Sequence, residues 1–162
     1  SKGYSTRKSI VIDKVKKAIE NRTTTAVKGI KFTYESGFLF ITLPSGRRLA
    51  YVKPKIIIDD SGREVITYEG VGTARKWERI ETYGPKVVEN VVQAVSRDIL
   101  CEAMERLKSY DIIMHIHDEI VVEATDDISL EHICNVMGEV PSWAKGLILR
   151  ADGYETEFYK KD

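Results

Sequence analysis

The sequence has few cysteines, no long apolar run and no net charge, and each shortage excludes a class of protein. Its two cysteines, Cys101 and Cys134, lie far apart without a CxxC pair, so neither a disulfide framework nor a structural zinc site is predicted. We expect both to be small core residues in a reducing cytoplasm. No apolar run approaches the roughly 20 residues that a membrane span needs, and the basic N-terminal segment lacks the apolar centre of a signal peptide. The sequence therefore predicts a protein without a membrane partner.

The net charge of zero hides an uneven distribution along the chain. Residues 1–80 carry 17 Lys and Arg against 8 Asp and Glu, a net of +9, whereas residues 81–162 have a net of −9. A basic half suits a polyanion and an acidic half suits divalent cations, although charged blocks are more often only solvated faces. The 43% of hydrophobic residues over 162 positions excludes a disordered tail and predicts a globular chain.

The pattern of apolar residues predicts an α+β fold, an antiparallel sheet with helices packed on it. The chain is expected to divide into residues 1–84, a basic part with a short helix and β-hairpins, and residues 85–162, which hold a long helix and a carboxylate hairpin. Residues 70–84 show no clear period and are predicted to form an ordered connector. Helices are expected at 10–19, 85–108 and 129–137, and strands at 30–34, 38–43, 48–52, 56–58, 65–68 and 147–151.

The densest set of reactive side chains lies in a predicted hairpin over residues 111–123, at His115, His117, Asp118 and Glu119. Alternation along a strand places His115 and His117 on one face and Asp118 at or beside the turn. Two adjacent carboxylates repel each other, and a bound cation such as Mg²⁺, which prefers hard oxygen ligands, would remove that repulsion. The alternative is a plain polar turn, since Asp is a common turn residue.

A zinc site built on the HxH pair His115 and His117 is a weaker alternative. Zinc wants three or four ligands, and the remaining histidine, His132, lies in a predicted helix without a His or Cys partner nearby.

The predicted long helix adds an independent signal. Lys86, Asn90, Gln93 and Arg97 follow spacings of four, three and four, so they form a stripe of hydrogen-bond donors. Donors suit the DNA minor groove, where every base pair presents acceptors, although a solvated helix face is the commoner explanation for such a stripe.

These motifs together resemble the C-terminal palm region of family A DNA polymerases, most closely the phage branch. The likeness covers most of the chain from about residue 15 onward. It includes the segments Leu43-Pro44-Ser45-Gly46-Arg47-Arg48-Leu49-Ala50-Tyr51, Tyr83-Gly84-Pro85-Lys86 with Asn90, Gln93, Arg97 and Asp98, His115-Ile116-His117-Asp118-Glu119, and Val140-Pro141-Ser142-Trp143.

The resemblance implies roles for individual residues. Asp118 is similar to the palm aspartate that binds the catalytic Mg²⁺ ions, and Glu119 to the neighbouring acid that supports the site. His117 is similar to the residue that contacts the primer strand near its 3′ end. Gln93 is similar to the glutamine that hydrogen-bonds in the minor groove at the primer terminus, with Asn90, Lys86 and Arg97 as its neighbours.

The function implied is template-directed nucleotidyl transfer by a two-metal mechanism, with primed template DNA and deoxynucleoside triphosphates as partners. The setting implied is the cytoplasm of a bacterial cell, with a phage or prophage origin. The family's first metal-binding aspartate and triphosphate-gripping helix have no match here, so we expect the chain to depend on the remainder of the polymerase and to be inactive alone. A non-catalytic DNA-binding or polymerase-associated module is the alternative.

Overall fold

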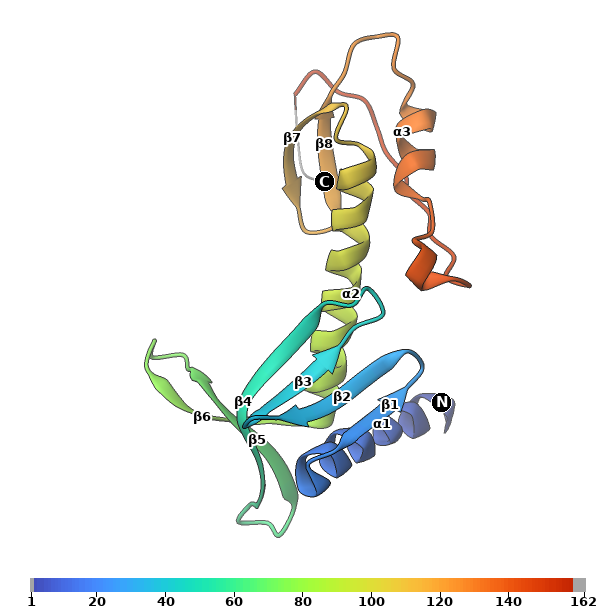
Figure 1. The fold of residues 1–162 in the computed structure, drawn as a ribbon. Helices are drawn as coiled ribbons and strands as arrows, with labels where there is room; N and C mark the ends of the chain where they lie inside the picture. Colours follow the sequence, from blue (N-terminus) through green and yellow to red (C-terminus); the bar gives the residue numbers. More distant parts are fainter. Residues whose placement is uncertain (1, 159–162) are drawn as a thin grey trace. The chain divides into compact units, whose positions relative to one another are not determined.

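The computed structural model describes residues 2–158, with side chains from residue 10 onward, and has the predicted α+β architecture with antiparallel sheets (Figure 1). The chain divides into two compact units, Ser1–Val95 and Ser96–Asp162. The expected division after residue 84 into two functional parts stays a prediction. None of the described helices is long and apolar enough to cross a membrane.

The first unit is a six-stranded antiparallel sheet with helices, and its strands follow sequence order from one edge to the other. Helix α2 (Gly84–Arg106) begins in this unit and ends in the second. The other elements of the unit are α1 (Lys2–Asn21), β1 (Thr24–Val27), β2 (Ile30–Glu35), β3 (Phe38–Thr42), β4 (Arg48–Ile58), β5 (Glu64–Val71) and β6 (Trp77–Thr82).

The core of the first unit lies between one face of the sheet and both of its helices. Alternation along β3 turns Leu39 and Ile41 inward, where they are 2% and 0% exposed, while Phe38 and Phe40 stack on the opposite face. Val15 from α1 and Val91 from α2 belong to the same buried cluster. Burial of one sheet face against two helices therefore fixes the register of the strands.

Strand β4 corrects the prediction of two separate strands at 48–52 and 56–58. The chain between them continues as strand, with an irregularity between Val52 and Lys55 where the register shifts. Lys53 takes a positive φ of 44°, as expected for an extra residue in a β-bulge. A bulge also tolerates Pro54, which cannot donate a ladder hydrogen bond.

Strand β6 corrects the prediction of a connector over 70–84. Trp77–Thr82 pairs with β5 along its whole length, from Val71 opposite Trp77 to Ile66 opposite Thr82. Ile80 is half-buried and Thr82 is buried, whereas Trp77, Glu78, Arg79 and Glu81 are exposed. The apolar alternation is weak because β6 lies at the edge of the sheet and buries little of either face.

The second unit contains the end of α2, the hairpin of β7 (Asp111–Ile116) and β8 (Glu119–Glu123), α3 (Leu130–Met137) and the 3-10 turn η1 (Ser142–Ala144). Ser129 caps α3 by accepting a hydrogen bond from the backbone N–H of His132. The α2 residues Leu100, Ala103 and Leu107 form a buried stripe one turn apart.

Two expectations for this unit are wrong. Residues 147–151 form no strand, because their apolar residues have no neighbouring strand to pair with, and Ile148 is 94% exposed. Cys101 is exposed rather than buried, because it lies off the Leu100–Ala103–Leu107 stripe, and Cys134 is half-buried.

Candidate functional site

The hairpin β7–β8 presents its polar residues at the tip, as predicted. Ile116 pairs with Glu119, so only His117 and Asp118 form the turn. His117 has a φ of 54°, and a tight turn of this length needs a positive φ at its first position. Histidine is one of the few non-glycine residues that adopt this conformation readily. The local sequence therefore forms a two-residue turn that places Asp118 at the exposed tip.

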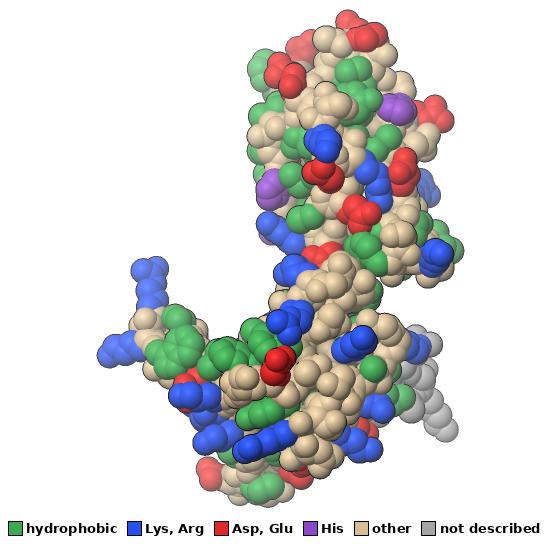
Figure 2. All heavy atoms as spheres, viewed as in Figure 1, with side chains coloured by type: hydrophobic (Ala, Val, Ile, Leu, Met, Phe, Trp, Pro, Cys, Tyr) green, Lys and Arg blue, Asp and Glu red, His purple; other side chains and the backbone are tan. Residues whose placement is uncertain are grey.

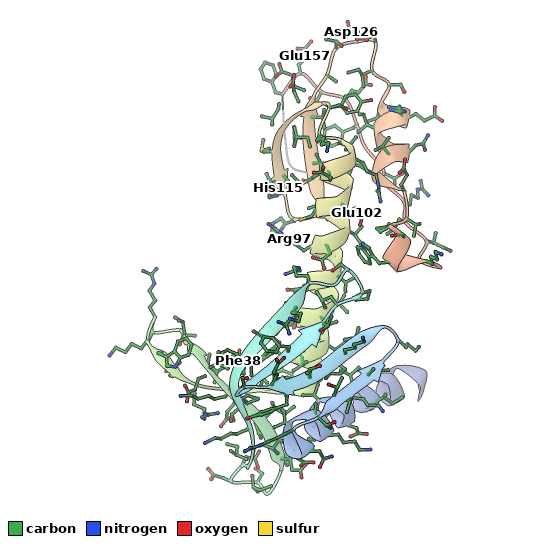
Figure 3. The ribbon with its side chains drawn as sticks, in the orientation of Figure 1. Phe38, Arg97, Glu102, His115, Asp126 and Glu157 are labelled. Atoms are coloured by element: carbon green, nitrogen blue, oxygen red, sulfur yellow. The ribbon has the colours of Figure 1, made fainter. Side chains whose placement is uncertain are left out.

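The histidines are arranged differently from the prediction. His115 lies in β7 with its side chain exposed (Figure 3), while His117 belongs to the turn and not to the strand, so strand alternation does not place the two on one face. Ile113 is an extra residue between two paired positions, which shifts the register within β7. The shared strand face expected for His115 and His117 is therefore not formed.

Asp118 and Glu119 are adjacent and exposed. Among residues 10–158, no three His, Cys, Asp or Glu side chains gather closely enough to hold a metal ion. The carboxylate oxygens of Asp118 fit Mg²⁺ in chemical type, since that ion takes one or two protein carboxylates and fills its shell with water and phosphate. They fall short in number for a complete site, because the other described residues bring no third ligand to them.

Helix α2 carries the four predicted donors, with Lys86, Asn90 and Gln93 in the first unit and Arg97 in the second. The prediction overlooked Glu89, which lies between them on the helix surface. Its carboxylate accepts a hydrogen bond from Gln93 Nε2 at 3.2 Å and pairs with Lys86 Nζ at 3.2 Å. Lys86 and Gln93 are therefore exposed and pre-positioned, but any acceptor that engages them must compete with a carboxylate.

Asn90 has different surroundings from Gln93. Its side chain is half-buried, and Nδ2 donates a hydrogen bond of 3.0 Å to the hydroxyl of Tyr51 on β4. Burial raises the pKa of Tyr51, and the hydrogen bond from Asn90 opposes that rise. Tyr51 also meets the edge of Tyr68 with ring centroids 5.0 Å apart. Asn90 thus ties α2 to the sheet.

A second link between the sheet and α2 was not predicted from the sequence. Arg47, in the turn between β3 and β4, donates from Nη2 to the backbone carbonyl of Ala94 at 3.0 Å. In the sequence, the Pro44-Ser45-Gly46-Arg47-Arg48 segment is noted only for its resemblance to polymerase sequences. An arginine beside a turn glycine suggests a polar contact, but the sequence does not indicate that its partner is a carbonyl of α2.

In the second unit, polar contacts of half-buried side chains fix the end of α2 against α3 and η1. Trp143 Nε1 donates to Glu102 at 2.6 Å, and Arg106 donates to the carbonyl of Glu139 at 3.0 Å. These residues lie 41 and 33 positions apart in sequence, so a local pattern could not have paired them.

A comparison with known proteins finds a clear similarity over most of the chain. The similar protein is one named "DNA polymerase" from Bacillus phage SP02, which is 49% identical over 151 residues and matches 90% of this chain. No family model matches the sequence, and no solved structure matches it. The chain spans 23% of the length of the phage protein, so the similarity concerns one portion of a larger polymerase.

Proposed function

We propose that the chain is the C-terminal palm part of a family A DNA polymerase, which extends primed template DNA with deoxynucleoside triphosphates. The observation that carries the proposal is the 49% identity with a phage protein named DNA polymerase, over a match long enough to include α2 and the hairpin β7–β8. The exposed carboxylate at the hairpin tip supplies the chemistry that such a role needs.

In the proposed reaction, the primer 3′-hydroxyl attacks the α-phosphorus of the incoming nucleotide, and pyrophosphate leaves. Asp118 would hold Mg²⁺, and the bound ion would supply charge that makes the hydroxyl more acidic and stabilises the leaving oxygens. Glu119 adds negative charge beside Asp118, and His117 contacts the primer backbone near its 3′ end. The two-residue turn keeps all three at the tip of a hairpin, where a DNA end can reach them.

The donors on α2 have a positioning role in this proposal. Gln93, with Lys86 and Arg97, checks the minor groove at the primer terminus, because acceptors occur there in every base pair and do not depend on sequence. Glu89 keeps Lys86 and Gln93 extended on the helix surface until DNA replaces it as their partner.

The test is Asp118→Asn in the polymerase that contains this chain. Asn fits a turn position well but lacks the charge that Mg²⁺ needs, so primer extension should fall by several orders of magnitude while the fold is kept. Asp126→Asn is the matched control, since Asp126 is an exposed carboxylate in the loop after β8, and it should extend at the normal rate. Near-normal extension by the Asp118→Asn protein would refute the assignment.

The alternative, a non-catalytic DNA-binding or polymerase-associated module, makes the opposite prediction. In that case both variants would bind DNA and support extension by a partner polymerase equally well.

A further inference from the structure

The β5–β6 hairpin carries an unusual combination of side chains for the edge of a sheet. It extends away from β1–β3 (Figure 1), and the structure describes it fully. Charged residues on an edge strand are ordinary, since they prevent edge-to-edge aggregation. An exposed tryptophan works against that purpose, and Trp77 is 60% exposed beside Val71, its cross-strand partner, which is 63% exposed.

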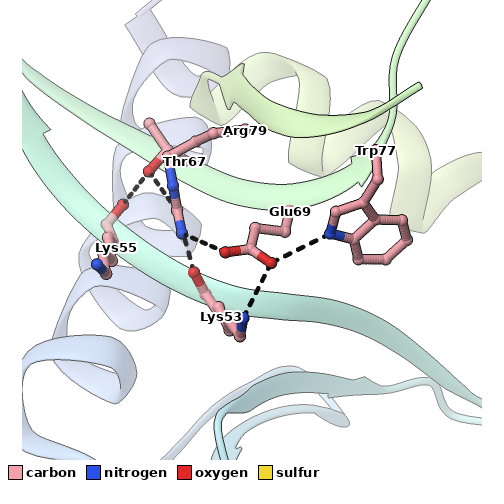
Figure 4. Close-up of polar contacts among 6 residues, drawn as sticks. All are labelled: Lys53, Lys55, Thr67, Glu69, Trp77 and Arg79. Carbon is pink, nitrogen blue, oxygen red and sulfur yellow. Dashed lines mark hydrogen bonds and ion pairs between the residues drawn. The ribbon is translucent and has the colours of Figure 1, made fainter.

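Trp77 is held in one orientation by a network of polar contacts (Figure 4). Its Nε1 donates to Glu69 Oε2 at 3.1 Å. Glu69 is held in turn by Lys53 at 3.2 Å and by Arg79 at 3.3 Å, and these contacts lower its pKa. Arg79 also donates to the carbonyl of Lys53 and to the hydroxyl of Thr67. The indole is thus fixed at its nitrogen edge and exposed over much of its surface.

The turn that connects β5 and β6 places an arginine where equivalent turns in this chain have glycine. Three hairpins close with the same pair of backbone hydrogen bonds. The left-handed position is occupied by Gly46 at φ 91°, by Gly62 at φ 75°, and by Arg75 at φ 55°. Glycine adopts this conformation without strain and arginine does not. Arg75 therefore makes this turn less stable than a glycine would.

The cations around Trp77 are available to an anionic partner. Figure 2 shows Lys and Arg side chains at the tip of the hairpin, where Arg75 and Lys76 are exposed. Among the described residues, no carboxylate lies within ion-pair distance of either. Lys53 keeps 63% of its side chain exposed while it contacts Glu69. We call these six residues, Lys53, Val71, Arg75, Lys76, Trp77 and Arg79, the arm surface.

We propose that the arm surface binds single-stranded DNA, with an unpaired base stacked on Trp77 and adjacent phosphates contacting Arg75 and Lys76. An exposed aromatic ring beside unpaired cations is the arrangement that recognises single strands without sequence preference. Duplex DNA offers phosphates but no free base face, so it fits only half of this surface. The choice of DNA over RNA rests on the proposed polymerase function. The binding of a single strand is inferred from the arm surface alone.

The experiment measures fluorescence anisotropy of a labelled oligo(dT) strand titrated with the 162-residue chain, in EDTA so that no metal site contributes. Trp77→Ala should weaken binding by about 5- to 150-fold, as loss of one stacked base implies, and Trp77→Phe should restore part of it. Fluorescence of Trp77, recorded in a Trp143→Phe background, should be quenched by the strand. A hairpin duplex of equal length should bind more weakly.

Arg75→Gly provides a variant with opposite effects on binding and stability. It should weaken binding and reduce the slope of log K against log salt by about 0.7, because one phosphate contact is lost. Its melting temperature should stay equal or rise, because glycine suits the positive φ. A folding defect would lower both the affinity and the melting temperature. This variant therefore separates loss of a phosphate contact from loss of structure.

Arg63→Ala is the matched control. Arg63 is a cation beside the turn of the neighbouring β4–β5 hairpin with 77% of its side chain exposed, but it pairs with Asp59 and has no tryptophan beside it. It should leave binding within about twofold. Full affinity in Trp77→Ala, equal loss in Arg63→Ala, or equal binding of duplex would overturn the proposal. Tighter binding of oligo(U) than of oligo(dT) would overturn the choice of DNA without touching the catalytic assignment.

Discussion

Side chains of the same chemistry on one helix do different work in this protein. Asn90 and Gln93 are both exposed-helix candidates by spacing, yet Asn90 donates to Tyr51 and Gln93 to Glu89. The sequence predicted the stripe, because helical periodicity is local. It could not predict the split, because Tyr51 lies 39 positions from Asn90 and its approach depends on how the sheet packs on α2.

We expect substitution of the two amides to change the free energy of unfolding by different amounts. Asn90→Ala should lower the free energy of unfolding by about 1 kcal/mol, because the largely buried Tyr51 hydroxyl loses its donor. Gln93→Ala should stay within about 0.5 kcal/mol of the wild type, as surface changes do. In the parent polymerase, Gln93→Ala should slow extension most at mispaired termini. Urea unfolding and primer extension check these outcomes, and equal stability loss in both variants would contradict the assignment.

Glu69 gives the arm surface a predictable response to pH. Its pKa is lowered in the folded chain by the hydrogen bond from Trp77 and by Lys53 and Arg79, from an ordinary value of 4.5. The resulting stability is present above that ordinary value and is lost as the pH falls through the lower folded pKa. Melting temperatures measured from about pH 6 to about pH 3 should therefore fall less steeply for Glu69→Gln than for the wild type. Identical profiles would show that the carboxylate contacts carry no stability.

At the scale of elements, strands with strict apolar alternation were predictable and strands defined by their partners were not. The predicted strands at 30–34 and 38–43 match β2 and β3, whose inward residues alternate. Strand β6 was missed because an edge strand buries few apolar side chains. Residues 147–151 were wrongly predicted as a strand because they form an apolar run, although no strand pairs with them. The helix at 10–19 was predicted too short, since α1 begins at Lys2 in a polar stretch without an apolar stripe.

The contact between α1 and the start of α2 offers a test of packing. A Cβ on Gly84 would lie 1.4 Å from Cδ1 and 2.2 Å from Cγ1 of Ile12, so no side chain fits without displacing Ile12. We expect Gly84→Ala to lower the free energy of unfolding by about 1–3 kcal/mol, the usual cost of overpacking. Combining it with Ile12→Ala should cost less than the sum of the two single changes. Strict additivity in urea unfolding would show that the two positions do not meet.

At the scale of the whole molecule, the proposed function requires catalytic groups beyond those that the described residues bring together. The described residues bring no third metal-ligating side chain to Asp118 and Glu119, and the chain spans 23% of its phage relative. The hairpin and the donor stripe could be predicted from the sequence because both are local patterns. The ligands that complete the proposed site are not local to this chain.

We therefore expect the 162 residues alone to show no template-directed synthesis with Mg²⁺ or Mn²⁺. Two adjacent carboxylates leave most of a metal shell to water, so the ion should bind weakly and the 3′-hydroxyl should stay unactivated. A primer-extension assay on the purified chain, beside the full polymerase as positive control, checks this. Template-dependent product from the chain alone would show that its site is complete.

The bulge in β4 allows this strand to lose one residue without a change in the pairing on either side. Because Lys53 is an extra residue opposite β5, a homologous chain lacking it would still turn Tyr51 and Ile56 toward the core. A deletion of Lys53 in a homologue would thus leave the strand register and the inward-facing residues of the sheet unchanged. It would remove the ammonium that holds Glu69 and the carbonyl that holds Arg79, and so release the indole of Trp77. Chains with the deletion should therefore also lack the tryptophan, and the two losses should be inherited together.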